Sequence, residues 1–108
     1  MRYLVTGGCG FVGSHIIERL IEDNHEVIVF DNLKIGKINN LKKVKNKFEF
    51  INGDIRHIES MEKIIRDVDG IFHEAALASV PESFKIPNEY YEVNVIGTQN
   101  VFQLAKKK

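Results

Sequence analysis

Short runs of β-branched and aromatic residues alternate along the chain with longer segments of helical periodicity. Four of these runs predict strands, at Tyr3–Val5, Val27–Phe30, Phe48–Ile51 and Gly70–His73. Val27–Phe30 is apolar without interruption, as expected for a strand buried on both faces of a parallel sheet. The alternation predicts an α/β fold, and right-handed crossovers would place the strands in the order 3-2-1-4, with helices on both faces.

The first helix is predicted from Phe11 to Asp23. One stripe of it carries Val12, Ile16 and Leu20, and a second stripe beside it carries Phe11, Ile17 and Ile21. Asn24 follows, and asparagine tolerates the left-handed conformation that ends many helices. Residues 34–47 contain six lysines and no acidic residue, which predicts a short solvated helix.

Two further helices are predicted in the second half of the chain. Their apolar positions are Ile58, Met61, Ile64 and Ile65 for one and Tyr91, Val95, Phe102 and Ala105 for the other. Pro87 opens the last helix, because proline is well tolerated in a first turn. Lys106–Lys108 end it, where cations complement the negative end of the helix dipole.

Length and composition place the chain among small intracellular proteins. Its 108 residues suit one domain, and 15 basic residues balance 15 acidic ones, so net charge favours neither nucleic acid nor a membrane as partner. No apolar run approaches the roughly 20 residues that span a bilayer. A single cysteine, Cys9, allows no internal disulfide and no multi-cysteine metal site. We expect a cytoplasmic protein without a metal.

The strongest motif is the glycine-rich stretch at residues 6–15, which follows a predicted strand and opens a predicted helix. Its glycines can be counted as Gly8-x-Gly10-x-x-Gly13 or as Gly7-x-x-Gly10-x-x-Gly13. Glycine permits a tight turn, and it lets the backbone approach a pyrophosphate closely. The following helix presents free N–H groups to the phosphates. The motif therefore predicts a Rossmann-like, dinucleotide-binding sheet.

A second element supports this interpretation. Asp31 ends the second predicted strand, 18 residues beyond Gly13, where a carboxylate can accept hydrogen bonds from the adenosine ribose. The same carboxylate would repel a 2′-phosphate, so NAD is favoured over NADP. Lys34 and Lys37 keep NADP as an alternative. The remaining alternative is that the glycines form only a tight turn and that Asp31 only caps a loop.

Five motifs in order resemble the extended short-chain dehydrogenase/reductase family, and within it the nucleotide-sugar epimerases and dehydratases. They lie at residues 6–15, 31–33, 53–56, 73–76 and 94–100 and cover essentially the whole chain. Residues 77–83 are similar to UDP-glucose and UDP-N-acetylglucosamine 4-epimerases. The resemblance implies NAD as cofactor and a nucleotide sugar as substrate of a complete family member.

The resemblance also implies which residues bind the cofactor. They lie in the glycine turn, at the ends of the second, third and fourth strands and in the last helix, and Ser79 would lie near the sugar or the cofactor. The implied cofactor-binding residues are Gly7, Gly10, Phe11, Val12, Gly13, Asp31, Asn32, Asp54, Ile55, Ala75, Ala76, Leu77 and Asn94.

Several of these residues also have ordinary structural interpretations. Ser79 can cap a helix or turn, Asp54 can cap its own loop, and His73 is expected to pack at a strand end rather than to catalyse. Cys9 is expected to be a passive small residue; the alternative is a redox-sensitive thiol activated by the helix N-terminus. Glu74 stands where an apolar or amide residue is usual in the family, without a functional explanation.

The family's chemistry requires a tyrosine with a lysine four positions later. Tyr3, Tyr90 and Tyr91 are followed at that distance by glycine, asparagine and valine, so no catalytic residue is predicted. We expect residues 1–108 to be the N-terminal portion of an NAD-binding domain, a sheet incomplete at its C-terminal side. The catalytic and sugar-binding regions are expected to be absent.

Three functions fit this sequence. The first is the NAD-binding portion of a nucleotide-sugar 4-epimerase, inactive alone and engaging the sugar only when the missing half is supplied. The second is a stand-alone NAD-binding or sensor module, and the third is the cofactor-binding half of a split enzyme. The open edge of the fourth strand also predicts self-association.

Overall fold

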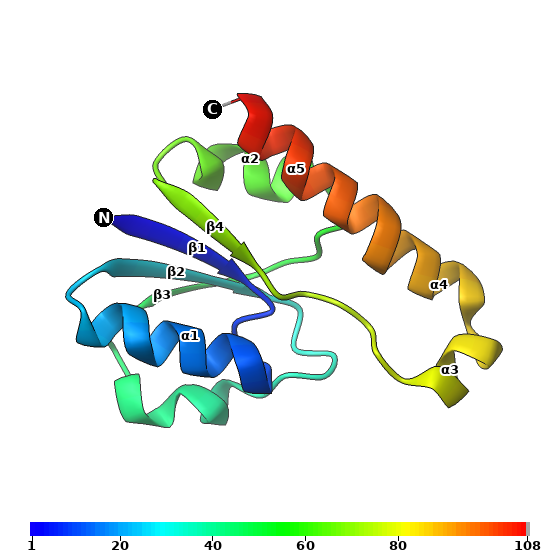
Figure 1. Ribbon diagram of the computed structural model, residues 1–108, viewed down its shortest axis with the longest axis horizontal. Helices are drawn as coiled ribbons and strands as arrows, with labels where there is room; N and C mark the ends of the chain where they lie inside the picture. The colour runs from blue at the N-terminus through cyan, green and yellow to red at the C-terminus, as the bar shows by residue number, and fades with distance from the viewer. Residues whose placement is uncertain (108) are drawn as a thin grey trace.

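Parallel strands form the centre of the molecule (Figure 1). The computed structural model describes residues 1–107, with the side chains of residues 1–106, so the predicted end of the last helix at Lys108 lies outside the described residues. Within this range the strands are β1 (Arg2–Thr6), β2 (Glu26–Asp31), β3 (Glu49–Asn52) and β4 (Gly70–His73). They pair in parallel in the order β3-β2-β1-β4, which confirms the predicted Rossmann-like topology.

Helices cover both faces of the sheet. The helix α1 (Phe11–Glu22) and the 3₁₀ helix η1 (Ile38–Val44) lie on one face, and α2 (Glu59–Ile65) and α5 (Thr98–Lys107) lie on the other (Figure 1). A third group, formed by α3 (Val80–Lys85), α4 (Pro87–Tyr91) and the π-helical turn η2 (Glu92–Gly97), extends from the carboxyl end of β4. The sheet's carboxyl edge is therefore partly enclosed.

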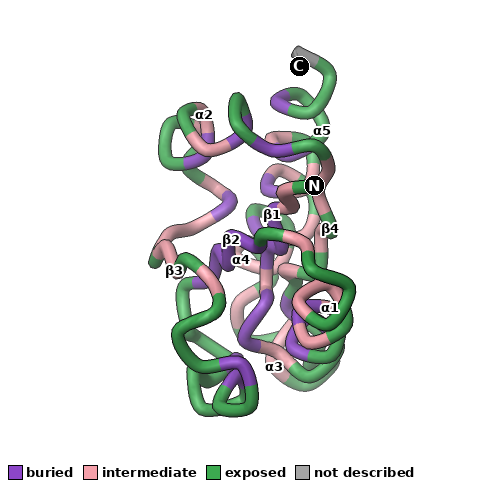
Figure 2. The backbone as a smooth tube through the Cα atoms, turned by 90° about the vertical axis from the view of Figure 1, so that its left-hand side faces the viewer, coloured by how far each residue is buried: buried purple, intermediate pink, exposed green. Residues whose placement is uncertain are grey.

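Alternating residues of the central strands supply two cores. Leu4, Ile28 and Phe30 face α2 and α5, whereas Val5 and Val29 face α1 and η1. The buried centre of the sheet runs through β1 and β2 in Figure 2. All of Val27–Phe30 is buried, which confirms the two-sided burial predicted from the uninterrupted apolar run.

The first helix packs differently from its predicted stripe. Ile17 is completely buried against the sheet, while Phe11 and Val12 are exposed. In the first turn the buried positions are Gly13 and Ser14, which leaves Phe11 and Val12 on the outer side of the helix. The helix ends at Glu22, and Asn24 has a positive φ of 65°, as predicted for the residue that follows a helix.

The lysine-rich segment and the region after β4 each contain a helix of unexpected form. Within residues 34–47 only Ile38–Val44 is helical, as the 3₁₀ helix η1, and its Leu41 and Val44 are buried against the face that α1 covers. The helix α3 was not predicted. Its first turn is stabilised by Ser79, whose side chain accepts a hydrogen bond from the Glu82 backbone N–H. The alternative in which Ser79 caps a helix is thus what the structure shows.

The apolar positions predicted for the last helix do not face the sheet. Tyr91, Val95, Phe102 and Ala105 are exposed, and the side that packs on the sheet carries Val93, Gly97, Val101 and Leu104. A side chain at Gly97 would meet the Ile55 side chain at 2.6 Å, so the absence of one lets η2 approach the loop after β3 closely. The helix is apolar on two sides, and close approach selects the side with glycine.

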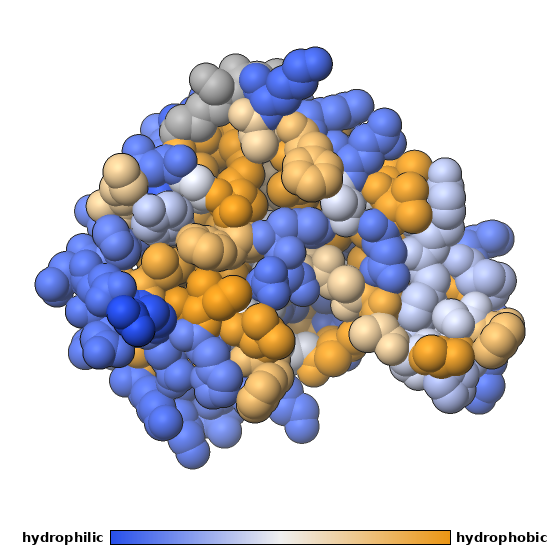
Figure 3. Space-filling model, in the orientation of Figure 1, coloured by the Kyte–Doolittle hydropathy of each residue, from blue (hydrophilic) through white to orange (hydrophobic). Residues whose placement is uncertain are grey.

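The strand β4 forms one edge of the sheet, and β3 forms the other. Phe72 on β4 and Phe102 on α5 are exposed, and apolar side chains gather around both elements on the face seen in Figure 3. The self-association predicted from the β4 edge stays a prediction. No helix within residues 1–107 is long and apolar enough to cross a membrane.

Candidate dinucleotide site

The turn after β1 requires glycine at two positions. Gly7 has a φ of 67°, and a Cβ atom there would lie 2.6 Å from the backbone nitrogen of Ala75. A Cβ atom at Gly13 would collide with the Gly7 carbonyl oxygen. The turn is closed by a hydrogen bond of 3.1 Å from the Gly10 N–H to the Gly7 carbonyl. The contact between Gly13 and Gly7 brings the start of α1 close to β1, and Gly8 is also tightly packed, because a Cβ atom there would lie 2.6 Å from the Ile17 side chain.

Asp31 links the end of β2 to this turn. One carboxylate oxygen accepts a hydrogen bond of 2.9 Å from the Cys9 N–H, and the other accepts one of 2.8 Å from the Leu33 N–H. The side chain is buried, and no cation pairs with it among the described ion pairs. Each oxygen keeps a lone pair for a further donor, such as a ribose hydroxyl.

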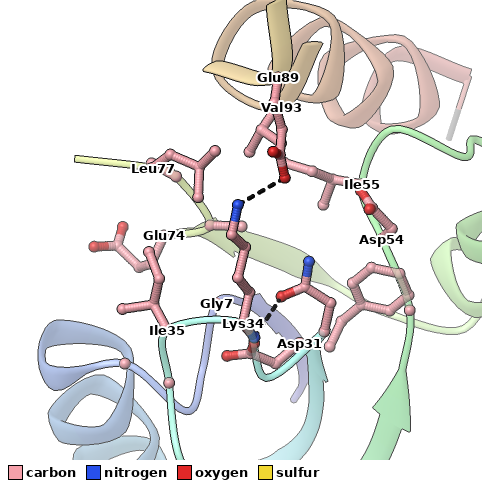
Figure 4. A pocket seen from close by; sticks show the side chains of 17 residues that line it. Gly7, Asp31, Lys34, Ile35, Asp54, Ile55, Glu74, Leu77, Glu89 and Val93 are labelled. Carbon is pink, nitrogen blue, oxygen red and sulfur yellow. Dashed lines mark hydrogen bonds and ion pairs between the residues drawn. The ribbon is translucent and has the colours of Figure 1, made fainter. Parts of the chain in front are cut away.

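A cleft opens at the carboxyl ends of the strands, where the order reverses between β1 and β4 (Figure 4). In sheets of this kind ligands bind at that point. The glycine turn forms one side of the cleft, and the loops after β2, β3 and β4 and one helical turn near Glu89 form the others. The described lining residues are Gly7, Gly10, Phe30, Asp31, Asn32, Lys34, Ile35, Gly36, Gly53, Asp54, Ile55, Glu74, Ala75, Ala76, Leu77, Glu89 and Val93.

At the β3 side of the cleft, Asp54 is held by its own loop. It accepts hydrogen bonds from the Arg56 backbone N–H at 2.9 Å and from the Arg56 guanidinium at 2.6 and 2.9 Å. The guanidinium holds the pKa of the Asp54 carboxyl below its ordinary value. Asp54 therefore stays ionised. It caps its own loop through the bonds to Arg56 and also lines the cleft.

A comparison with protein-family models matches residues 3–108 to the NAD dependent epimerase/dehydratase family. The chain belongs to this family. The match includes the glycine turn, Asp31 and the loops that line the cleft. The resemblance stated from the five motifs is thereby confirmed.

Individual family members are similar along almost the whole chain. A UDP-glucose 4-epimerase of Halalkalibacterium halodurans is 43% identical over 95% of this chain and 30% of its own. UDP-glucuronic acid decarboxylase 1 of Danio rerio is 41% identical over 98% of this chain and 25% of its own. The crystal structure of the Thermus thermophilus UDP-glucose 4-epimerase in complex with NAD is 40% identical, with a TM-score of 0.87, over 99% of this chain and 34% of that one.

The chain thus spans about a third or less of the length of these relatives. An epimerase and a decarboxylase match it about equally well, so the matched part is common to family members of different activity.

The structure brings most of the predicted binding residues to the cleft. Those that line it are Gly7, Gly10, Asp31, Asn32, Asp54, Ile55, Ala75, Ala76 and Leu77. Phe11, Val12 and Gly13 lie just outside, in the first turn of α1, where backbone N–H groups lack a partner within the helix. What they offer to an anionic ligand is backbone N–H groups rather than side chains.

Two predicted residues lie behind or beyond the cleft. Asn94 does not line it; its Oδ1 accepts a hydrogen bond from the Leu77 N–H, and its Nδ2 donates one to the Leu77 carbonyl, both at 2.8 Å. Asn94 therefore positions the cleft wall. Ser79 is exposed, and its N–H donates to the Tyr90 hydroxyl at 3.0 Å. Tyr90 in turn donates to Glu82, so the tyrosine is part of a local network.

Sequence reasoning did not assign a binding role to several lining residues, among them Gly36 and Glu89. A Cβ atom at Gly36 would meet the Cys9 carbonyl carbon at 2.6 Å, so this glycine lets the loop after β2 pack on the glycine turn. Its position five residues after Asp31 was a usable signal. Glu89 gave no such signal, because its partner Lys34 is 55 positions away in the chain.

Cys9 is a structural residue. It is completely buried, and burial, together with the nearby Asp31 carboxylate, raises the pKa of its thiol to about 11. Burial and the raised pKa both disfavour the reactive thiolate, so they support a passive residue rather than the redox-sensitive alternative. The positive end of the α1 dipole does not offset the rise in the Cys9 pKa that burial causes.

We predict that Cys9 in the folded chain resists alkylation. At about pH 8, iodoacetamide is expected to modify it at least tenfold more slowly than the same thiol in denaturant, because burial blocks access and keeps the thiol protonated. Mass spectrometry of timed samples measures this. Equal rates in the folded and denatured chain would show that the glycine turn opens freely.

His73 connects the end of β4 to β1 and α5. The Thr6 hydroxyl oxygen accepts hydrogen bonds from the Glu74 and Ala75 N–H groups and lies 2.7 Å from His73 Nδ1. With both lone pairs used, the hydroxyl must donate to Nδ1, so the proton sits on Nε2 and is donated to Thr98 Oγ1 at 2.8 Å. His73 is thus a neutral packing residue, as predicted.

Lowering the pH is expected to destabilise the fold through His73. Burial lowers its pKa in the folded state, so below the ordinary value of about 6.5 the unfolded chain binds more protons than the folded one. The stabilisation is full above that pH and is lost as the pH falls through the lowered pKa. Urea unfolding at several pH values between about 5 and 8 measures it.

The matched control for this prediction is the exposed His57. The variant His73→Gln should show a flatter loss of stability between about pH 7 and pH 5, and His57→Gln should keep the wild-type slope. An unchanged slope in His73→Gln would contradict the neutral, doubly bonded state of the imidazole.

No group of three or more His, Cys, Asp or Glu side chains within residues 1–107 is arranged to hold a metal ion.

Proposed function

We propose that this chain is the NAD-binding part of a nucleotide-sugar 4-epimerase. One observation carries the proposal: the buried Asp31 carboxylate is held beside the glycine turn by backbone N–H groups and lines a cleft at the strand-order reversal. This arrangement provides a phosphate site and a ribose site next to each other. The family match and the relatives' NAD complexes support it.

The residues present fit the cofactor. The backbone at Gly7 and Gly10 and the first turn of α1 would hold the pyrophosphate, because both glycines line the cleft without a side chain and the helix dipole favours anions there. Asp31 and Asn32 would bind the adenosine ribose. Asp54 and Ile55 would lie against the adenine, and the wall around Leu77 would face the nicotinamide half.

NAD supplies a hydride acceptor when bound, and the sugar would be oxidised at C4 and reduced again on its other face. This chain's own residues would bind and orient the cofactor and exclude water from it. The relatives named above include UDP-sugar 4-epimerases, which favours a UDP-sugar as the substrate of the whole protein. The chain contains no Tyr-x-x-x-Lys pair, so we expect negligible turnover of UDP-glucose by these residues alone.

The proposal also covers cellular context. A single cysteine, Cys9, which is buried and unpaired, suits a reducing compartment, so we place the chain in the cytoplasm. Residues 1–108 would act as one NAD-binding unit and meet a nucleotide sugar only together with a catalytic region.

Calorimetric titration of the purified chain tests the proposal. We expect one NAD to bind per chain and NADP to bind at least about tenfold more weakly, because Asp31 repels the 2′-phosphate. Proton NMR lines of the chain should shift on NAD addition in the same samples. A folded chain that binds neither dinucleotide at millimolar concentration would overturn the proposal.

A further inference from the structure

An ion pair crosses the mouth of the cleft. Lys34 extends from the loop after β2, Glu89 extends from α4, and the Lys34 Nζ lies 2.7 Å from the Glu89 Oε1 (Figure 4). Both side chains are about one-third exposed. The pair therefore connects two segments far apart in the chain over the space in which the ribose site lies.

The charges lining the cleft are strongly unequal. Among the described lining residues Lys34 is the only lysine or arginine, whereas Asp31, Asp54, Glu74 and Glu89 are acidic. Asp54 is already paired with Arg56, and Asp31 is bonded to backbone N–H groups. Lys34 is thus the one cation on the cleft's described lining that could attract an additional anionic group on the ligand.

Lys34 stands three residues after Asp31, on the loop that begins at the ribose site. Dinucleotide sites that accept the 2′-phosphate of NADP use a cation in this neighbourhood. By position alone Lys34 would qualify. Its ammonium group, however, is hydrogen-bonded to Glu89. This contact raises the pKa of Lys34 and holds the ammonium group beside the Glu89 carboxylate.

We propose that Glu89 is a specificity-determining residue: by pairing with Lys34 it prevents that lysine from binding a 2′-phosphate and so excludes NADP. This inference rests on the proposed binding of NAD and deepens it. Asp31 repels the 2′-phosphate directly. Glu89 acts from the opposite side of the cleft, by neutralising the cation that would otherwise compensate for Asp31.

The expected effect is moderate, because the pair is partly exposed and water screens it. Removing the Glu89 charge leaves Lys34 free for a dianionic phosphate, which is a stronger partner than a single carboxylate. We expect NADP to gain about three- to tenfold in affinity in Glu89→Gln, and NAD to change by less than about twofold. The gain should shrink as salt is added, because the new contact is electrostatic.

The experiment titrates NAD and NADP into four chains by calorimetry: wild type, Glu89→Gln, the double variant Lys34→Met with Glu89→Gln, and Glu92→Gln. Glu92 lies one helical turn from Glu89, close to Arg56, and does not line the cleft, so it controls for net charge. The NADP gain is expected in Glu89→Gln, and it should be absent from the double variant and from Glu92→Gln. Urea unfolding verifies that each chain is folded.

The outcomes separate the two proposals. Wild type that binds no NAD overturns the proposed function itself. Wild type that binds NAD, with Glu89→Gln showing no preferential gain for NADP, overturns only the role of Glu89. A gain that persists without Lys34, or that Glu92→Gln reproduces, also contradicts it, because the effect would then come from overall charge.

Discussion

The variant Gly7→Ala is expected to lose about 3 kcal/mol of folding free energy, and its NAD binding with it. Alanine would have to adopt a φ of 67°, and its methyl group would lie 2.6 Å from the Ala75 backbone nitrogen. The left-handed conformation costs about 1–2 kcal/mol, and forced overpacking typically adds about 1–3 kcal/mol. A small domain has only about 5–15 kcal/mol in total. Urea unfolding followed by circular dichroism measures the loss.

Gly10→Ala is the matched control for this experiment. Gly10 lies in the same turn, but its φ is negative and an added Cβ atom would meet only the Gly7 carbonyl oxygen, at 3.3 Å. Its stability should fall by about 1 kcal/mol or less. Equal losses at the two positions would contradict the assignment of Gly7 as the point of close approach between β1 and β4.

The second large effect is expected from Asp31→Asn, which should weaken NAD binding about 10- to 100-fold. An ionised acceptor for ribose hydroxyls is replaced by a neutral amide, and hydrogen bonds to charged groups are worth about 1.5–3 kcal/mol. The amide NH₂ would also face either the Cys9 or the Leu33 N–H, donor against donor. Discrimination against NADP should fall at the same time, because the repelling charge is gone.

Asp23→Asn controls for the loss of one negative charge. Asp23 is bonded to Arg19 on the exposed end of α1 and does not line the cleft. Calorimetry with NAD and NADP on both variants, each shown to be folded, gives the comparison. If Asp31→Asn kept wild-type affinity for NAD, the ribose would not be held where the structure places the carboxylate.

Local sequence patterns were enough to predict the sheet and the part of the site formed by the glycine turn and Asp31. The strands are short apolar runs with turns between them, and their parallel order follows from the handedness of the crossovers, so Val27–Phe30 and Gly70–His73 were found at or within a residue or two of their ends. The glycine turn and Asp31 belong to one βαβ unit. Their meeting in the fold is therefore a short-range consequence of the sequence.

The failures arise where two alternatives are locally equal or where contacts are long-range. The last helix offers an apolar side with Tyr91 and Phe102 and another with Val101 and Leu104, and only the approach of Ile55 to Gly97 selects between them. The Lys34–Glu89 pair depends on how far the segment after β4 extends before it returns. The hydrophobic pattern of the loop that carries Lys34, or of the segment that carries Glu89, does not predict how close the two segments come in the fold.

The two hydrogen bonds between the Asn94 side chain and the Leu77 backbone affect how tightly a ligand can be held. Both backbone groups of Leu77 are already bonded to one amide side chain, at 2.8 Å each, before any ligand arrives. Ordering a loose segment on association would consume part of the interaction energy, at about 1–2 kcal/mol per backbone residue. The cleft wall at Leu77 is already ordered before binding. Less of the interaction energy of a ligand that contacts it is therefore spent on ordering the backbone.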